Sequence, residues 1–170
     1  MKAKATWSVR PKAARDAGAV VALLADVARE GRWIATEWPF DVAARSEAMR
    51  TAILDRRIVG WCAVDGPALI GDLTVYGIER PEPEIGMIVA ATHRGRGIGR
   101  ALIECALAWA AAGGREALRL RVFPDNEPAI GLYRATGFVD VAEPPAAIAR
   151  TGGAPRSVLT MRRAIAAPLP

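Results

Sequence analysis

The chain reads His93-Arg94-Gly95-Arg96-Gly97-Ile98-Gly99-Arg100 between a short apolar run, 84–89, and an alanine-rich helical pattern that ends at Gly113-Gly114. This order predicts a strand, then a glycine-rich turn, then a helix. Glycines let backbone amides approach a ligand closely, and the amides at a helix start lack partners inside the helix. The helix dipole and the three arginines add positive potential, so the stretch predicts a site for a phosphate-bearing ligand.

The glycine spacing excludes two common nucleotide-binding loops. A dinucleotide fingerprint needs G-x-G-x-x-G/A, but Arg100 or Leu102 takes the place of the third small residue, depending on which glycine starts the count. A Walker loop needs a lysine followed by serine or threonine, and none follows here. The pattern that remains is Arg94-x-x-Gly97-x-Gly99. A basic, glycine-rich helix entry that binds nothing is the alternative that this segment alone leaves open.

Length and composition are typical of one domain, expected to occupy 1–170. Apolar residues make up 52% of the chain, yet no apolar run approaches the roughly 20 residues that a membrane span needs. The basic N-terminus lacks the apolar stretch of a secretory signal. These features predict a cytoplasmic protein without a membrane partner, with a flexible tail over 164–170.

The net charge of +5 raises the question of a nucleic-acid partner. The arginines are scattered and no aromatic platform lies between them, so no nucleic acid is expected, although a basic nucleic-acid binder stays as a third hypothesis. His93 is the single histidine, and Cys62 and Cys105 lack a Cys-x-x-Cys spacing. We therefore expect no metal site, no Ser-His-Asp triad, and two buried reduced thiols.

Hydrophobic periodicity and turn residues divide the chain in the order β α α β β β α β α β β, a mixed α/β domain. Strands are expected at 7–10, 58–64, 68–76, 84–89, 117–123, 138–141 and 157–163. Helices are expected between Asp16 and Gly31, between Asp41 and Leu54, over 97–112, and between Asn126 and Thr136. The residues Asp16, Asp41 and Asn126 are the expected N-caps. Residues 143–155, rich in proline and glycine, are expected to form a loop.

A second motif joins the first and carries a resemblance to a known family. Its residues are Val122, Asn126, Ala129, Leu132, Tyr133, Gly137 and Phe138. They are similar to the V-x-x-x-N-x-x-A-x-x-L-Y-x-x-x-G-F signature of the GCN5-related N-acetyltransferase (GNAT) family. Arg94-x-x-Gly97-x-Gly99 resembles the loop with which that family binds the diphosphate of coenzyme A. One helix and one strand separate the two motifs, and the resemblance covers about 6–163.

The resemblance implies a fold and an assembly. The fold is α/β: a mixed, mostly antiparallel sheet of about seven strands, splayed between the fourth and the fifth and flanked by about four helices. The pantetheine arm of the cofactor lies in the gap. Members often form homodimers, so a homodimer is one expected state. Residues 143–155 could then form a dimer contact or a second wall of the acceptor site.

The resemblance also implies acetyl-CoA as the cofactor and names the residues that hold it. The pyrophosphate loop consists of Arg94, Gly95, Arg96, Gly97, Ile98, Gly99 and Arg100. The backbone groups of Met87, Ile88 and Val89 would meet the pantetheine amides and polarise the thioester carbonyl. Asn126 would contact the cofactor arm while it caps its helix.

Two residues match catalytic positions of the family. Tyr133 matches the general acid that protonates the coenzyme A sulfur, and its alternative is a packed tyrosine with a capped hydroxyl. Glu84 matches a general base that acts directly or through water, and its alternative is a solvated or ion-paired carboxylate.

The amine acceptor is expected at the loop between the first two helices. Glu37 lies between Trp33 and Trp38, and a carboxylate flanked by indoles can orient a cationic amine. The alternative is a packed apolar loop with Glu37 facing solvent. The expected reaction is direct transfer of the acetyl group, in a ternary complex, to a primary amine of a small molecule, an amino acid analogue or a peptide. A non-catalytic acyl-CoA-binding or sensing module is the alternative function.

Overall fold

The computed structural model describes residues 6–143 and 146–166. Its helices are α1 (Ala17–Arg29), α2 (Val42–Leu54), α3 (Ile98–Ala112) and α4 (Glu127–Ala135). Its strands are β1 (Trp7–Pro11), β2 (Ile58–Asp65), β3 (Ala68–Tyr76), β4 (Glu84–Val89), β5 (Ala117–Val122), β6 (Val139–Asp140), β7 (Ala146–Arg150) and β8 (Gly153–Ala164). Residues 167–170 of the expected tail lie outside the described residues, whereas residue 164 belongs to β8.

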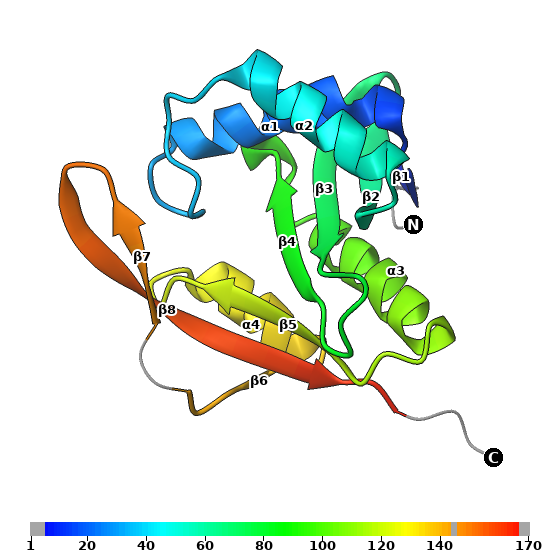
Figure 1. Ribbon diagram of the computed structural model, residues 1–170, viewed down its shortest axis with the longest axis vertical. Coiled ribbons are helices and arrows are strands. Elements are labelled where there is room, and N and C mark those ends of the chain that lie inside the picture. Colours follow the sequence, from blue (N-terminus) through cyan, green and yellow to red (C-terminus); the bar gives the residue numbers. More distant parts are fainter. Residues whose placement is uncertain (1–5, 144–145, 167–170) are drawn as a thin grey trace.

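The strands form one sheet in the order β1-β2-β3-β4-β5-β8-β6, and β7 pairs with β8 beyond that path. Among the described strands, only β4 and β5 pair in parallel, and they meet at a single register position, Glu84 opposite Arg119. From there the two strands diverge, β4 toward the α1–α2 layer and β5 toward the β7–β8 hairpin (Figure 1). The expected splay between the fourth and fifth strands is therefore confirmed.

Helices cover the two faces of the sheet differently. α3 covers the face of the sheet toward which a Cβ at Gly71 would project, because that atom would meet the Ile98 and Leu102 side chains. α1 packs on β3 and β4 from the other face. The largest fully buried side chains, which form the core between α3, α4 and the sheet, are Phe138, Leu73, Ile98, Leu102, Ile103, Leu118, Leu120 and Met161.

Two of the three predicted N-caps are confirmed. The Asp41 carboxylate accepts a hydrogen bond from the Ala44 amide at 2.9 Å, and the Asn126 side chain accepts one from the Ala129 amide at 3.3 Å. Asp16 precedes α1, but its carboxylate makes no capping bond. It instead binds the Arg10 guanidinium through two bonds of 2.8 Å and accepts a third bond of 2.8 Å from the Ala13 amide, which precedes the helix.

The structure corrects two further expectations. Residues 146–150 form β7 instead of part of a loop, because they pair with a β8 strand that begins earlier than predicted. Their alternation is too weak to indicate a strand without that partner. Both cysteines are free, but Cys105 is only half-buried, so the expectation of two buried thiols is right for Cys62 alone. No helix in the described part of the chain has the length and apolarity needed to cross a membrane.

Candidate active site

One cavity of about 640 Å³ lies where β4 and β5 diverge. Its walls come from β4, from the start of α3, from α4, from the end of β5, and from α1 with the loop that follows it. The β7–β8 hairpin adds Ile148 and Val158. Thirteen of the site residues expected from the sequence line this cavity: Trp33, Glu84, Met87, Ile88, Val89, Arg94, Gly95, Gly97, Ile98, Gly99, Arg100, Asn126 and Tyr133.

The entry to α3 provides an anion site built from backbone. Gly95 and Gly97 have φ angles of +74° and +84°, a region that residues with a Cβ rarely adopt. Gly97 is the N-cap and offers no side chain, so the first-turn amides have neither an intrahelical partner nor a capping side chain. At Gly99 a Cβ would lie 2.7 Å from a Leu132 methyl carbon, so α3 and α4 approach closely there. A pair of linked phosphates fits this cradle.

The three arginines of the loop differ in their partners. The Arg94 guanidinium donates to the Glu30 carboxylate at 2.6 and 2.8 Å, and its Nε donates to the Val89 carbonyl at 3.1 Å. This hydrogen bonding from Arg94 lowers the pKa of Glu30. Arg96 is absent from the cavity wall, and its guanidinium lies 3.4 Å from the Thr6 hydroxyl. Arg100 lines the cavity, so it is the loop arginine placed to add an uncompensated charge.

β4 supplies backbone groups and one carboxylate. Because β5 pairs with it only at Glu84, the remaining groups on that edge, over 85–89, have no partner in β5. The Glu84 carboxylate accepts a hydrogen bond from Arg121 Nε at 3.0 Å. Both side chains are substantially exposed, at 41% and 49%, so the pair is a solvated one that a ligand can rearrange.

Tyr133 lies on the cavity wall contributed by α4. Its ring packs edge-on against Phe138 at 5.8 Å, and only 8% of the residue is exposed. Burial raises the pKa of the phenol to about 12. Burial is the only cause of that pKa shift, since among the described residues no side chain forms a hydrogen bond with the hydroxyl. Asn126 lines the same wall. Its side-chain oxygen accepts a hydrogen bond from the Ala129 amide, which leaves the Asn126 side-chain nitrogen available to a ligand.

The three acceptor-side residues are not brought together. Trp33 lines the main cavity, whereas Glu37 and Trp38 line a second pocket. The Glu37 carboxylate accepts hydrogen bonds from the Thr151 amide and hydroxyl, at 3.0 and 2.8 Å. Trp38 lies under the Arg29 guanidinium, 4.0 Å from its ring centroid.

Several cavity residues carried no signal in the sequence. They are Arg45, Asp72, Tyr76 and Arg121, of which Arg121 pairs with Glu84. Tyr76 and Glu84 are opposite each other in the β3–β4 register, as are Asp72 and Ile88. Knowledge of the β3–β4 register would have placed Tyr76 and Asp72 at the cavity, but local sequence patterns do not reveal the register between two strands.

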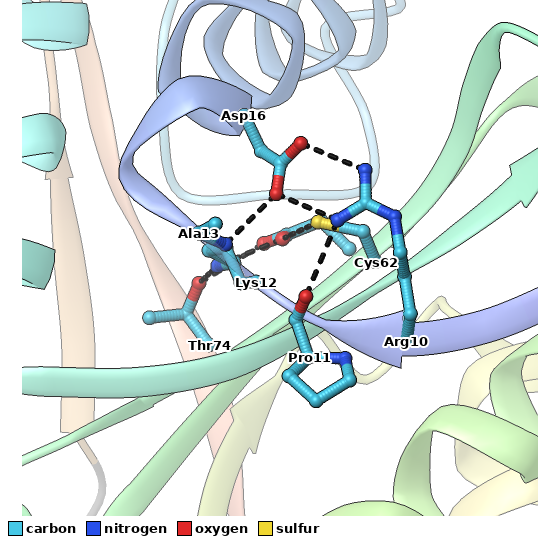
Figure 2. Close-up of polar contacts among 8 residues, drawn as sticks. Arg10, Pro11, Lys12, Ala13, Asp16, Cys62 and Thr74 are labelled. Carbon is cyan, nitrogen blue, oxygen red and sulfur yellow. Dashed lines mark hydrogen bonds and ion pairs between the residues drawn. The ribbon is translucent and has the colours of Figure 1, made fainter.

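A buried ion pair, Lys12 with Asp72, lies at the wall of the cavity. Lys12 Nζ is 2.7 Å from Asp72 Oδ1, and the two side chains are only 1% and 6% exposed. Lys12 also donates to the Thr74 hydroxyl, which donates to Asp72 Oδ2 at 3.0 Å. Figure 2 shows this group beside the Arg10–Asp16 pair, with the Cys62 sulfur between them. Burial raises the pKa of Cys62 to about 12, which makes it a poor nucleophile.

Comparison with known proteins agrees with this geometry. The sequence model of the acetyltransferase (GNAT) family matches residues 21–138. An uncharacterised N-acetyltransferase of Bacillus subtilis (strain 168), YobR, is 37% identical over 57 residues, which are 34% of this chain and 23% of that protein. The streptothricin acetyltransferase of Escherichia coli is 40% identical over 52 residues, 31% of this chain and 30% of that protein. The chain thus matches less than a third of the length of these curated relatives.

A solved structure shares the fold over nearly the whole chain. The putative acetyltransferase yncA of Salmonella typhimurium, solved with its cofactor acetyl-CoA, superimposes with a TM-score of 0.79 at 17% identity. The superposition covers 95% of this chain and 95% of that one. At this identity the likeness shows the fold.

Proposed function

The chain belongs to the acetyltransferase (GNAT) family, and from this premise we propose that it transfers the acetyl group of acetyl-CoA to a primary amine. The amine attacks directly, in a ternary complex, and belongs to a small molecule, an amino acid analogue or a peptide. The single observation that carries the proposal is the glycine cradle at Gly95–Arg100, open to the same cavity as Tyr133 and Glu84. A cytoplasmic location and a homodimeric state remain predictions.

The cradle and the open edge of β4 are the groups proposed to hold acetyl-CoA. The first-turn amides of α3, with Arg100, would bind the diphosphate, and the edge of 85–89 would bind the pantetheine amides. Acetyl-CoA supplies a thioester, which is an acyl group with a good leaving group. An amide N–H of Met87, Ile88 or Val89 then stands as the hydrogen-bond donor for the oxyanion that develops on the carbonyl.

Glu84 is the proposed base, acting directly or through a water. A free alkyl ammonium has a pKa of about 10.4, so an attacking amine must first lose a proton at neutral pH. The carboxylate lies on the cavity wall and its partner Arg121 is exposed, so an incoming ammonium can replace that partner. This position supports the role of base better than that of a structural ion pair.

Tyr133 is the proposed donor to the leaving sulfur. Its pKa of about 12 keeps the phenol protonated throughout the physiological range. A free thiol has a pKa of about 8.5, so complete proton transfer from this phenol to a thiolate is unfavourable. Tyr133 would therefore stabilise the developing sulfur charge mainly by donating a hydrogen bond, with the final proton supplied by the acceptor amine or by solvent.

Calorimetry followed by a turnover assay tests the proposal. Acetyl-CoA should bind with micromolar or tighter affinity, and thiol release should depend on an added primary amine. Binding without amine-dependent thiol release from a broad amine panel would support the non-catalytic acyl-CoA sensor instead. No binding at all would reject the cradle as the cofactor site.

A further inference from the structure

Two segments more than a hundred residues apart join over the acceptor side of the cavity. One is the α1–α2 loop, residues 32–37, and the other is the end of the β7–β8 hairpin, residues 150–156. Arg150 donates to the Ile34 and Ala35 carbonyls at 3.1 and 3.2 Å. We name these joined segments the bridge, and Figure 1 shows the loop and the hairpin on the same side of the molecule.

Two more contacts complete the bridge. Glu37 accepts from the Thr151 amide and hydroxyl, and its carboxylate lies 3.7 Å from Arg150 Nη1. Arg156 donates to the Arg32 carbonyl at 3.0 Å and to the Asp125 carboxylate at 2.9 Å. The connection therefore consists of several charge-assisted hydrogen bonds and not of one surface ion pair.

Aromatic packing holds the arginines of the bridge in place. Phe123 is 3% exposed, and the guanidinium groups of Arg156 and Arg150 lie 3.8 and 5.0 Å from its ring centroid. The Arg150 side chain is only 11% exposed, although its guanidinium bonds to two carbonyls. A planar guanidinium that is both stacked and hydrogen-bonded has little freedom left, so the bridge is preorganised.

The loop half of the bridge is also a wall of the cavity, and the strands that flank the hairpin half, β7 and β8, line the cavity as well. The loop contributes Trp33, Ile34, Ala35 and Thr36, and the hairpin contributes Ile148 and Val158. A polypeptide that presents an internal lysine must leave the site in two directions, along a groove that is open at both ends. In this protein the loop and the hairpin, which would be the two sides of such a groove, are joined to each other by hydrogen bonds.

On the basis of the proposed function, we infer that the bridge closes the acceptor site to the internal lysines of polypeptide chains and that the acceptor is the free amine of a compact molecule. The cavity of about 640 Å³ has to hold both the reacting end of the cofactor and this amine. Arg150 and Glu37 are thereby specificity-determining residues, although neither contacts the reacting atoms. They act by excluding longer acceptors.

The test opens the bridge with the double variant Arg150→Ala/Glu37→Ala, the bridge variant. Arg57→Ala/Asp55→Ala is the matched control, because it also removes one charge of each sign, at an exposed ion pair outside the bridge. Each protein is assayed with a panel of compact primary amines and with a twelve-residue peptide that has one internal lysine. In wild type, kcat/KM for the best compact amine should exceed kcat/KM for the peptide by at least about 100-fold. In the bridge variant this ratio should fall at least about tenfold, because kcat/KM for the peptide rises.

A second measurement does not depend on turnover. Calorimetric titration of the peptide into protein saturated with coenzyme A should give binding to the bridge variant and none to wild type or to Arg57→Ala/Asp55→Ala. Hydrogen exchange should find the Thr151 amide protected in wild type and exposed in Glu37→Ala.

The inference is overturned if wild type acetylates or binds the peptide as well as the compact amines. It is equally overturned if the bridge variant retains the wild-type ratio and still excludes the peptide, or if the Thr151 amide exchanges freely in wild type. If wild type does not bind acetyl-CoA, or releases no thiol in response to amines, the proposed function is rejected instead. Hydrogen exchange at the Thr151 amide would still test whether the bridge forms.

Discussion

The Tyr133 hydroxyl is a hydrogen-bond donor that stands buried beside the cavity and keeps its proton at neutral pH. In Tyr133→Phe the ring still packs against Phe138, so the fold and the cradle should persist. We expect turnover to fall about 10- to 100-fold, which is at or below the usual range for a general acid. Steady-state kinetics check the fall, and calorimetry should find acetyl-CoA affinity unchanged. An unaltered turnover number would remove Tyr133 from the mechanism.

Glu84 and Arg121 form a pair whose two members can be separated by experiment. Glu84→Gln keeps the size of the side chain and removes the base, so the amine must lose its proton to bulk solvent. The pH–rate profile of kcat/KM should then move to higher pH or be suppressed throughout.

Arg121→Gln is the matched control, because it breaks the same 3.0 Å contact but keeps the carboxylate. Its profile should retain the wild-type shape. If both variants behave alike, the ion pair matters and Glu84 is not the base.

At the scale of elements, the start of α3 depends on a backbone conformation that only glycine adopts readily. Gly97 has a φ of +84°, and a Cβ there would only touch the Trp7 ring at 4.0 Å, so a valine is excluded by strain and not by collision with the protein. Gly97→Val should abolish acetyl-CoA binding in calorimetry, because the first-turn amides turn away and the branched side chain fills the phosphate site.

Gly114→Val controls for the strain alone. Gly114 follows the other end of α3 with a φ of +63°, in open space, and it is absent from the cavity wall. This variant should lose comparable thermal stability and keep its cofactor affinity. Retained binding by Gly97→Val would mean that the phosphates lie elsewhere.

Elements whose pattern is local were predictable from the sequence. Asp41 and Asn126 cap their helices as expected, and the splay after Glu84 follows the family resemblance. β7 was not predictable, because Ala146–Arg150 becomes a strand only through pairing with β8. The same holds for Asp16, whose carboxylate binds the Arg10 guanidinium and the Ala13 amide and not an amide of α1.

The candidate site divides in the same way. The cofactor side is a continuous motif, so its residues could be listed from the sequence. The acceptor side depends on contacts such as Arg150 with Ile34, which join residues 116 positions apart. No periodicity or turn signal contains that information.

For the whole molecule, the junction between β1 and α1 rests on two ion pairs. Hydrogen bonding from Arg10 lowers the pKa of Asp16 from 3.8 to about 2. The carboxylate therefore stabilises the fold fully above about pH 4, and this contribution, at most about 2 kcal/mol, is lost as the pH falls toward 2.

Denaturation with urea between pH 2 and 7 checks this contribution. The free energy of unfolding of Arg10→Gln should lie below that of wild type at neutral pH, and the difference should shrink below pH 4. A difference that stays constant with pH would mean that Arg10 stabilises by packing and not through Asp16.

The second pair, Lys12 with Asp72, ties the chain after β1 to the centre of β3. Because both side chains are almost fully buried, removal of one leaves the other as an uncompensated charge. Lys12→Met and Asp72→Leu should each lower the free energy of unfolding by about 3–5 kcal/mol. The double variant should recover most of that loss, since burial of two apolar side chains needs no compensating charge. A double-mutant cycle by urea denaturation measures the coupling, and strictly additive losses would show that the two residues stabilise the protein independently.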